Sequence, residues 1–230
     1  MKKYLLFAGL GILIAVSFYA GILPVNAAQF FESFSGYIAD TCFSDGTSFG
    51  PWTVVFAGFG CVKVESDGVN SWLHAVPKAP KGGNTHSALT VGPEFSDAIT
   101  YGVNINTVGQ TRTKMKPRSW EVGWVVWNYT DNDHFYYFIP KTNGWELGKR
   151  DPAYTGGQRF LSTGTSPTFP IGQSYSVRIT QNATNTMSAS VNGQLLTTFT
   201  DTERPYTSGK IGLYTEDAHV HFDDIFVTQP

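Results

Sequence analysis

The residues of this chain whose types and spacing could do chemistry are mostly aromatic rings suited to holding a sugar. Trp124, Trp127 and Tyr129 follow one another closely, and Tyr136 comes in the next stretch of apolar residues. Sugars present C–H patches that stack on such rings, and their hydroxyls bond to nearby amides and carboxylates. Alternation along a strand places Trp124 on one face and Trp127 and Tyr129 on the other. The sequence therefore predicts a saccharide platform on one face and core packing on the opposite face, without saying which is which.

Acidic residues are not spaced for glycoside hydrolysis. Retaining glycosidases need two carboxyl groups about 5 Å apart across a cleft. On a strand this requires acids at positions i and i+2 or i+4, which point the same way. Glu121 is alone on its segment, and Asp201 and Glu203 lie in a stretch that ends at Pro205 and is expected to be a loop. We therefore do not expect hydrolysis by a carboxylate pair.

Two features near the C-terminal end could hold a cation. His219 and His221 share a strand face, but zinc sites usually need three or four protein ligands and no third is evident. Farther along, the apolar side chains change faces between Phe222 and Ile225. Because faces alternate strictly along a strand, this change predicts a β-bulge at Asp223–Asp224, which re-aims a carboxylate. A structural cation is expected there.

These residues must be positioned by strands, because no amphipathic helix is evident after residue 28. Alternating apolar segments recur every 8–12 residues, and Asn-Gly pairs at 143–144 and 192–193 mark tight turns between them. The chain has 24 Gly, 17 Phe and 11 Tyr, as expected for many short strands and turns. The pattern predicts an all-β fold of two antiparallel sheets packed face to face, in a single domain over residues 29–230.

The first 28 residues differ from the rest. A positive start is followed by an apolar run from Tyr4 to Leu23 and then by small residues. This is typical of a secretory signal peptide, although a run of that length also fits an uncleaved membrane anchor. An exported domain with two cysteines, Cys42 and Cys61, is expected to form a disulfide; the alternative is two buried thiols. With 16 basic and 18 acidic residues, the chain lacks the excess positive charge typical of nucleic-acid binding.

Several segments carry a family resemblance. They are the stretches at 120–124 (WEVGW), 129–138 (YTDNDHFYYF) and 145–149 (WELGK), the hairpin at 191–193 (VNG), and the terminal segments 209–214 (GKIGLY) and 222–225 (FDDI). Together they resemble the concanavalin A-like lectin/glucanase superfamily, which includes LamG-like domains, and they extend over most of residues 30–227. The resemblance implies a two-sheet antiparallel β jelly roll. It also implies, by analogy with several of these families, a structural calcium bound by Glu32 and Asp223.

The resemblance leaves function open, because the superfamily contains lectins, binding modules, hydrolases and polysaccharide lyases. The segment from Lys210 to Tyr214 is similar to the strand of alginate-lyase-type families in which the Tyr is catalytic. A lyase would then use Tyr214 and His86 as acid and base, with Gln110 and Arg112 facing a uronate carboxylate. The Arg-rich and Gln-Ile-His strands of those lyases are missing.

We therefore expect an extracellular, secreted or cell-surface domain that binds a polysaccharide or other glycan on its concave sheet. A β-eliminating lyase acting on a uronate polymer is the first alternative, and a non-catalytic structural protein of a surface or matrix is the second. No nucleic acid is expected as a partner, and no membrane unless the N-terminal segment is retained.

Overall fold

The computed structural model describes residues 29–229, which form two antiparallel β-sheets. The predicted all-β sandwich is therefore confirmed. The nine-stranded sheet has the order β15 (Gln194–Thr200), β14 (Thr186–Val191), β13 (Ser174–Gln181), β8 (Ile99–Gln110), β17 (Ala218–Thr228), β6 (Ser71–Val76), β5 (Cys61–Ser66) and β2 (Cys42–Phe43), and β1 (Phe30–Glu32) also pairs with β17. The eight-stranded sheet has the order β12 (Gln158–Gly164), β11 (Gly144–Arg150), β10 (His134–Lys141), β9 (Gly123–Asp131), β16 (Ser208–Glu216), β7 (Ser87–Ser96), β4 (Trp52–Phe56) and β3 (Ser48–Phe49).

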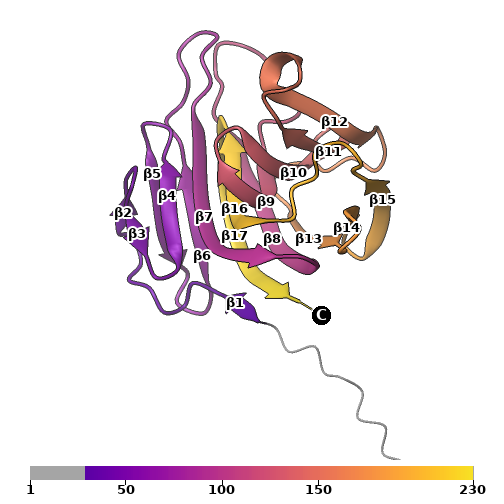
Figure 1. Ribbon diagram of the computed structural model, residues 1–230. Coiled ribbons are helices and arrows are strands. Elements are labelled where there is room, and N and C mark those ends of the chain that lie inside the picture. Colours follow the sequence, from indigo (N-terminus) through magenta and orange to yellow (C-terminus); the bar gives the residue numbers. More distant parts are fainter. Residues whose placement is uncertain (1–28, 230) are drawn as a thin grey trace, which may run out of the picture.

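The last two strands hold the middle of the molecule together. β16 and β17 run through its centre, with β2–β5 on one side and β10–β15 on the other (Figure 1). They lie in different sheets, so the acidic turn between them crosses from one layer to the other. Each pairs with two strands that are distant in sequence: β16 lies between β7 and β9, and β17 lies between β6 and β8.

The main hydrophobic core lies between the two sheets. Trp127 and Phe138 point into it from the eight-stranded sheet, and Val177 and Phe222 from the nine-stranded sheet; all four are fully buried. Burying a large apolar side chain stabilises a fold by about 1.5–3 kcal/mol. A second, smaller cluster lies on the opposite, outer face of the eight-stranded sheet and contains Trp124. This sheet therefore has apolar side chains on both faces.

The bulge predicted at Asp223–Asp224 is confirmed. Asp223 pairs with Asn104 of β8, whereas Phe226 pairs with Gly102, so β17 has one residue more than β8 over this interval. Asp224 adopts a positive φ of 48°, as the extra residue of a bulge can.

A second bulge, which the sequence analysis did not predict, interrupts β9. Val126 pairs with Gly212 of β16 and Tyr129 pairs with Lys210, so three steps along β9 match two along β16. The bulge includes Asn128, whose φ is +50°, a conformation that Asn tolerates better than most residues. As a result Tyr129 joins the outer cluster with Trp124 and not the face of Trp127.

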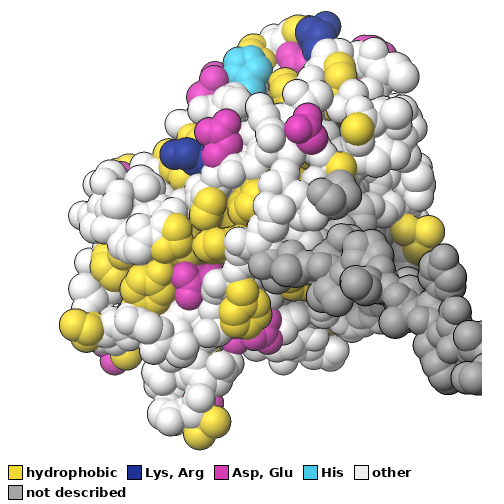
Figure 2. Space-filling model, turned by 60° about the horizontal axis from the view of Figure 1, so that its bottom comes forward, with side chains coloured by type: hydrophobic (Ala, Val, Ile, Leu, Met, Phe, Trp, Pro, Cys, Tyr) yellow, Lys and Arg dark blue, Asp and Glu magenta, His cyan; other side chains and the backbone are white. Residues whose placement is uncertain are grey.

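The predicted disulfide between Cys42 and Cys61 is present, with Cα atoms 5.6 Å apart, and it joins β2 to β5 at the edge of the nine-stranded sheet. The predicted signal peptide, residues 1–28, lies outside the described residues. In residues 29–229, no helix is long and apolar enough to cross a membrane. The face of the molecule in Figure 2 carries more acidic than basic side chains around its hydrophobic patches.

Candidate functional site

Two adjoining cavities, of about 200 and 430 Å³, lie on the outer face of the eight-stranded sheet. Trp124, Gln158 and Glu216 line both of them, so we treat them as one site and call it the outer hollow. Its other polar and aromatic lining residues include Trp120, Asn132, Lys141, Asn143, Glu146, Arg150, Phe160 and Tyr214.

The floor of the outer hollow is made of packed aromatic rings. Trp124 of β9 and Tyr214 of β16 are directly opposite each other in the sheet, and their ring centroids are 4.7 Å apart. Tyr137, from β10, packs on the other side of Trp124 at 5.2 Å. Trp120, just before β9, is 37% exposed. The site therefore has a fixed floor and one accessible indole beside it.

A carboxyl group and a phenol form the first polar pair of the outer hollow. Tyr214 and Glu216 are at positions i and i+2 of β16, and the Tyr214 hydroxyl donates to Glu216 Oε1 at 2.7 Å. Burial raises the pKa of Glu216 above its usual range, and the charges of Asp217 and Glu121 raise it further. Burial, followed by the charge of Glu216, also raises the pKa of Tyr214 well above its usual value. Glu216 therefore keeps a proton to higher pH than a free carboxyl, and Tyr214 stays neutral.

A second carboxyl group enters the hollow from β11. Glu146 Oε2 lies 2.8 Å from Lys141 Nζ, and Glu146 Oε1 accepts a hydrogen bond from the Tyr137 hydroxyl at 3.0 Å. Gln158 Nε2 in turn donates to Tyr137 Oη at 2.5 Å. These contacts fix the carboxylate while leaving it, Lys141 and Gln158 in the wall of the hollow.

The hollow thus combines what carbohydrate chemistry requires. Its rings can stack on a sugar, and its amide, ammonium and carboxyl groups can bond to hydroxyls. Glu146 and Glu216 sit in different environments, one paired with a cation and the other buried beside a phenol. Two carboxyl groups held in different environments can divide the roles of base and acid.

Sequence reasoning missed Lys141, Glu146, Gln158 and Glu216. The search for paired acids considered neighbours on a single strand, whereas Glu146 and Glu216 come from β11 and β16, which are separated in the sheet by β10 and β9. The i, i+2 spacing of Tyr214 and Glu216 on one strand face was a signal that could have revealed Glu216.

The predicted saccharide platform is divided by the sheet. Trp124 and Tyr129 lie on the outer face, as part of the second cluster. Trp127 and Tyr136 are fully buried between the sheets, where Trp127 donates to Gln181 and Tyr136 donates to Asp201. The expectation that these two rings contact a ligand is therefore corrected: strand alternation turns both of them into the core.

Arg112, predicted to face a uronate, is occupied by the protein itself. Its guanidinium is buried, Nε lies 2.7 Å from Glu121 Oε1, and Nη2 pairs with Asp217. Gln110 belongs to β8 of the other sheet, and its amide donates to the carbonyl of Arg118. Neither side chain lines the outer hollow.

His86, predicted as the second catalytic group, makes contacts outside the hollow, although the next residue, Ser87, accepts a hydrogen bond from the Tyr214 hydroxyl at 3.0 Å. His86 Nδ1 is 2.7 Å from the carbonyl oxygen of Lys78, its ring packs against Phe59, and it lines neither cavity of the hollow. Tyr214, His86 and Gln110 therefore do not converge on one groove.

The predicted calcium ligands lie where β1 meets β17, since Glu32 pairs with Ile225 beside the bulge that contains Asp223. Asp223 accepts a hydrogen bond from Asn70 Nδ2 at 2.7 Å. Burial raises the pKa of the Asp223 carboxyl, and the charges of Asp224 and Glu32 add to this effect. A cation would relieve that repulsion, so calcium at this place stays a prediction. The Glu32 carboxylate already accepts hydrogen bonds from Phe34 N, Tyr37 Oη and Trp52 Nε1.

Solved structures with the same architecture include proteins of several kinds. The carbohydrate-binding module CBM66 from Bacillus subtilis is 13% identical, with a TM-score of 0.56 over 79% of this chain and 98% of that one. A beta-glucanase from Bacillus licheniformis is 14% identical, with a TM-score of 0.54 over 87% of this chain and 98% of that one. A Bacillus subtilis protein with a galectin-like fold is 14% identical, with a TM-score of 0.53 over 84% and 98%. At these identities the likeness shows the fold alone, and it confirms the concanavalin A-like jelly roll.

The sequence itself gives a more specific relationship. No curated protein matches the chain. A family model described as the 3-keto-alpha-glucoside-1,2-lyase-like domain matches residues 45–228, which include every strand of the eight-stranded sheet and all residues of the outer hollow. The chain belongs to the family of 3-keto-alpha-glucoside-1,2-lyase-like domains.

Proposed function

We propose that this domain binds a carbohydrate, of the α-glucoside class, in the outer hollow of its eight-stranded sheet. The observation that carries the proposal is the arrangement of Trp120 and Trp124 beside Glu146, Gln158 and Glu216 in one continuous depression. A sugar ring stacks on Trp120, which is exposed, and its hydroxyls meet the amide and carboxyl groups of the wall. The names of the family and of the CBM66 module support a glycan as the ligand.

The proposal places the domain outside the cytoplasm. The disulfide between Cys42 and Cys61 supports an oxidising compartment, because such bonds are rare where thiols are kept reduced. The apolar N-terminal segment, which is typical of a secretory signal peptide, also supports export.

A second candidate function is β-elimination on a 3-keto-α-glucoside, as the family's name suggests. A ketone at C3 makes the proton at C2 acidic. A base removes that proton, the C1–O bond to the aglycone breaks, and a C1=C2 double bond conjugated to the ketone forms. An acid protonates the departing oxygen, and the products are therefore an enone and an alcohol.

The outer hollow contains groups for each of these roles. Glu146, held by Lys141 at 2.8 Å, serves as the base at C2. Lys141 and Gln158 stabilise the negative charge that develops on the C3 oxygen. Glu216, whose pKa is raised by burial, holds a proton for the leaving oxygen. The specific observation favouring this function over binding alone is that the two carboxyl groups have different environments.

The geometry does not favour the uronate-lyase alternative. Arg112 is committed to Glu121 and Asp217, so it is not free to neutralise a substrate carboxylate. The raised pKa of Tyr214 also makes its phenol a poor base near neutral pH.

Binding and reaction are tested with the same small probes. Methyl α-glucoside and its 3-keto form are titrated calorimetrically into the wild-type domain, Trp120→Ala and Trp72→Ala. Trp72 is the matched control, since it lies on the outer face of the opposite sheet. We expect a loss of at least tenfold in affinity for Trp120→Ala and none for Trp72→Ala. Equal affinity of all three proteins would contradict a site in the outer hollow.

The elimination is followed by the ultraviolet absorbance of the enone formed from the 3-keto probe. We expect turnover by the wild type, with losses of at least 100-fold in Glu146→Gln and Glu216→Gln. Binding without any enone would reject the elimination and leave the binding proposal standing.

A further inference from the structure

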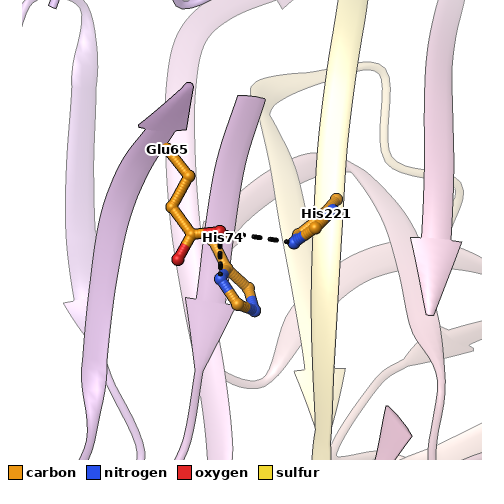
Figure 3. A group of neighbouring side chains, drawn as sticks. All are labelled: Glu65, His74 and His221. Carbon is orange, nitrogen blue, oxygen red and sulfur yellow. Dashed lines mark ion pairs between the residues drawn. The ribbon is translucent and has the colours of Figure 1, made fainter. Parts of the chain in front are cut away.

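The outer face of the nine-stranded sheet carries a cluster that the proposed function does not use. Glu65 of β5, His74 of β6 and His221 of β17 come from three neighbouring strands and point toward one another (Figure 3). His74 and His221 are directly opposite each other in the β6–β17 pair. The cluster belongs to a different sheet from the outer hollow.

The donor atoms of the three side chains are already close. Glu65 Oε2 lies 2.9 Å from His74 Nδ1 and 3.6 Å from His221 Nε2, and one donor atom from each residue lies within 4.8 Å of the other two. Around a tetrahedral zinc ion with bonds of about 2.0–2.1 Å, donor atoms are about 3.3–3.5 Å apart. Small side-chain rotations would bring the three atoms to that spacing.

The protein does not otherwise satisfy this cluster. Both ring nitrogens of His74 are buried; Nε2 has no hydrogen-bond partner, and Nδ1 faces Glu65 Oε2 at 2.9 Å. Buried polar atoms without partners are rare in folded proteins, and a bound ion can satisfy them. The second oxygen of Glu65 is taken by Lys63 Nζ at 2.5 Å, which leaves Oε2 directed at the histidines.

The ring of His221 is held in place beside the other two donors. Trp72 packs against the His221 ring at 4.9 Å and limits its rotation. A ring whose orientation is fixed in this way suits a metal ligand.

We propose that Glu65, His74 and His221 form a zinc-binding site on the outer face of the nine-stranded sheet. Two imidazoles and one carboxylate suit zinc and related divalent transition metals, whereas calcium prefers oxygen ligands alone. A bound ion clamps β5, β6 and β17 together. The fourth coordination position takes water or a group from a ligand. The sequence had shown only His221 with its neighbour His219, because His74 and Glu65 reach the site from strands more than 140 residues away in the chain.

The test uses the disulfide-bonded protein after treatment with a chelator. Zinc is titrated calorimetrically, and Co²⁺ is added as a spectroscopic probe whose visible absorption reports nitrogen and oxygen coordination. We expect one equivalent of zinc to bind and a higher Tm in its presence. His74→Gln and His221→Gln each weaken zinc binding at least tenfold and remove the Co²⁺ band, while both variants keep the circular dichroism spectrum of the wild type.

His134→Gln is the matched control, because His134 pairs with an acid, Asp131 at 2.8 Å, but has no second histidine beside it. It leaves zinc affinity unchanged. The proposal is overturned if the wild type binds no stoichiometric zinc, or if binding survives in His74→Gln. Should either histidine variant fail to fold, Glu65→Gln gives the same test, since it removes the carboxylate but keeps both rings.

Discussion

Replacing Arg112 by methionine tests whether this residue stabilises the fold or binds a ligand. The Arg112 side chain is 2% exposed, and its partners Glu121 and Asp217 are 1% and 0% exposed. Removing the guanidinium leaves two buried carboxylates without a counterion. Breaking a buried ion pair in this way costs about 3–5 kcal/mol. For a domain of this size, about 2–4 °C of Tm is lost per kcal/mol, so we expect Tm to fall by about 6–20 °C.

The assays are thermal denaturation for Tm and chemical denaturation for the free energy of unfolding, with Arg178→Met as the control. Arg178 is exposed on β13 and lies over Phe226 at 5.3 Å, so its loss should cost no more than about 1 kcal/mol. Combining Arg112→Met with Glu121→Gln and Asp217→Asn removes all three charges and should cost less than Arg112→Met alone.

The reasoning is refuted if Arg112→Met loses less than about 1 kcal/mol while its affinity for an acidic glycan falls sharply. That outcome would mean that Arg112 serves a ligand and not the fold. The same substitution has a second consequence in the hollow. Asp217 and Glu121 already raise the pKa of Glu216, so removing their counterion should raise it further.

Three further outcomes are expected. Because the pKa of Glu216 is raised in the folded state, its contribution to stability is present below the ordinary pKa of Glu, about 4.3, and is lost as the pH rises through the folded value. Glu216→Gln should therefore flatten the dependence of Tm on pH between pH 4 and 8, and an unchanged slope would contradict the shift. Replacing Cys42 and Cys61 together by Ser should cost about 3 kcal/mol in urea denaturation without reductant, and a change near zero would argue against the disulfide. Millimolar calcium should raise Tm in the wild type but not in Asp223→Asn, and an equal response of both proteins would exclude Asp223 as a ligand.

The sequence predicted the fold well because strand alternation and turns are local signals. The bulge at Asp223–Asp224 was visible because apolar residues change faces around it. The bulge at Asn128 was not, since Tyr129 is aromatic and suits either face of β9. The local pattern alone could not decide which face of β9, that of Trp124 or that of Trp127, packs into the core between the sheets.

The site was harder to predict because its residues meet only through strand order. Glu146 and Glu216 share the outer hollow because β11 and β16 lie in the same sheet, an arrangement that their positions in the chain do not indicate. Arg112 was interpreted as a ligand contact because no local pattern links it to its buried partners, Glu121 and Asp217. Charged residues gain their roles from such tertiary neighbours.

Hydrogen–deuterium exchange with and without the 3-keto probe tests the central claim most directly. If the ligand binds in the outer hollow, protection should appear in β9, β11 and β16, whose residues line the cavities, and not in β6 or β17 of the opposite sheet. Protection confined to β6 and β17 would contradict a carbohydrate site on the eight-stranded sheet.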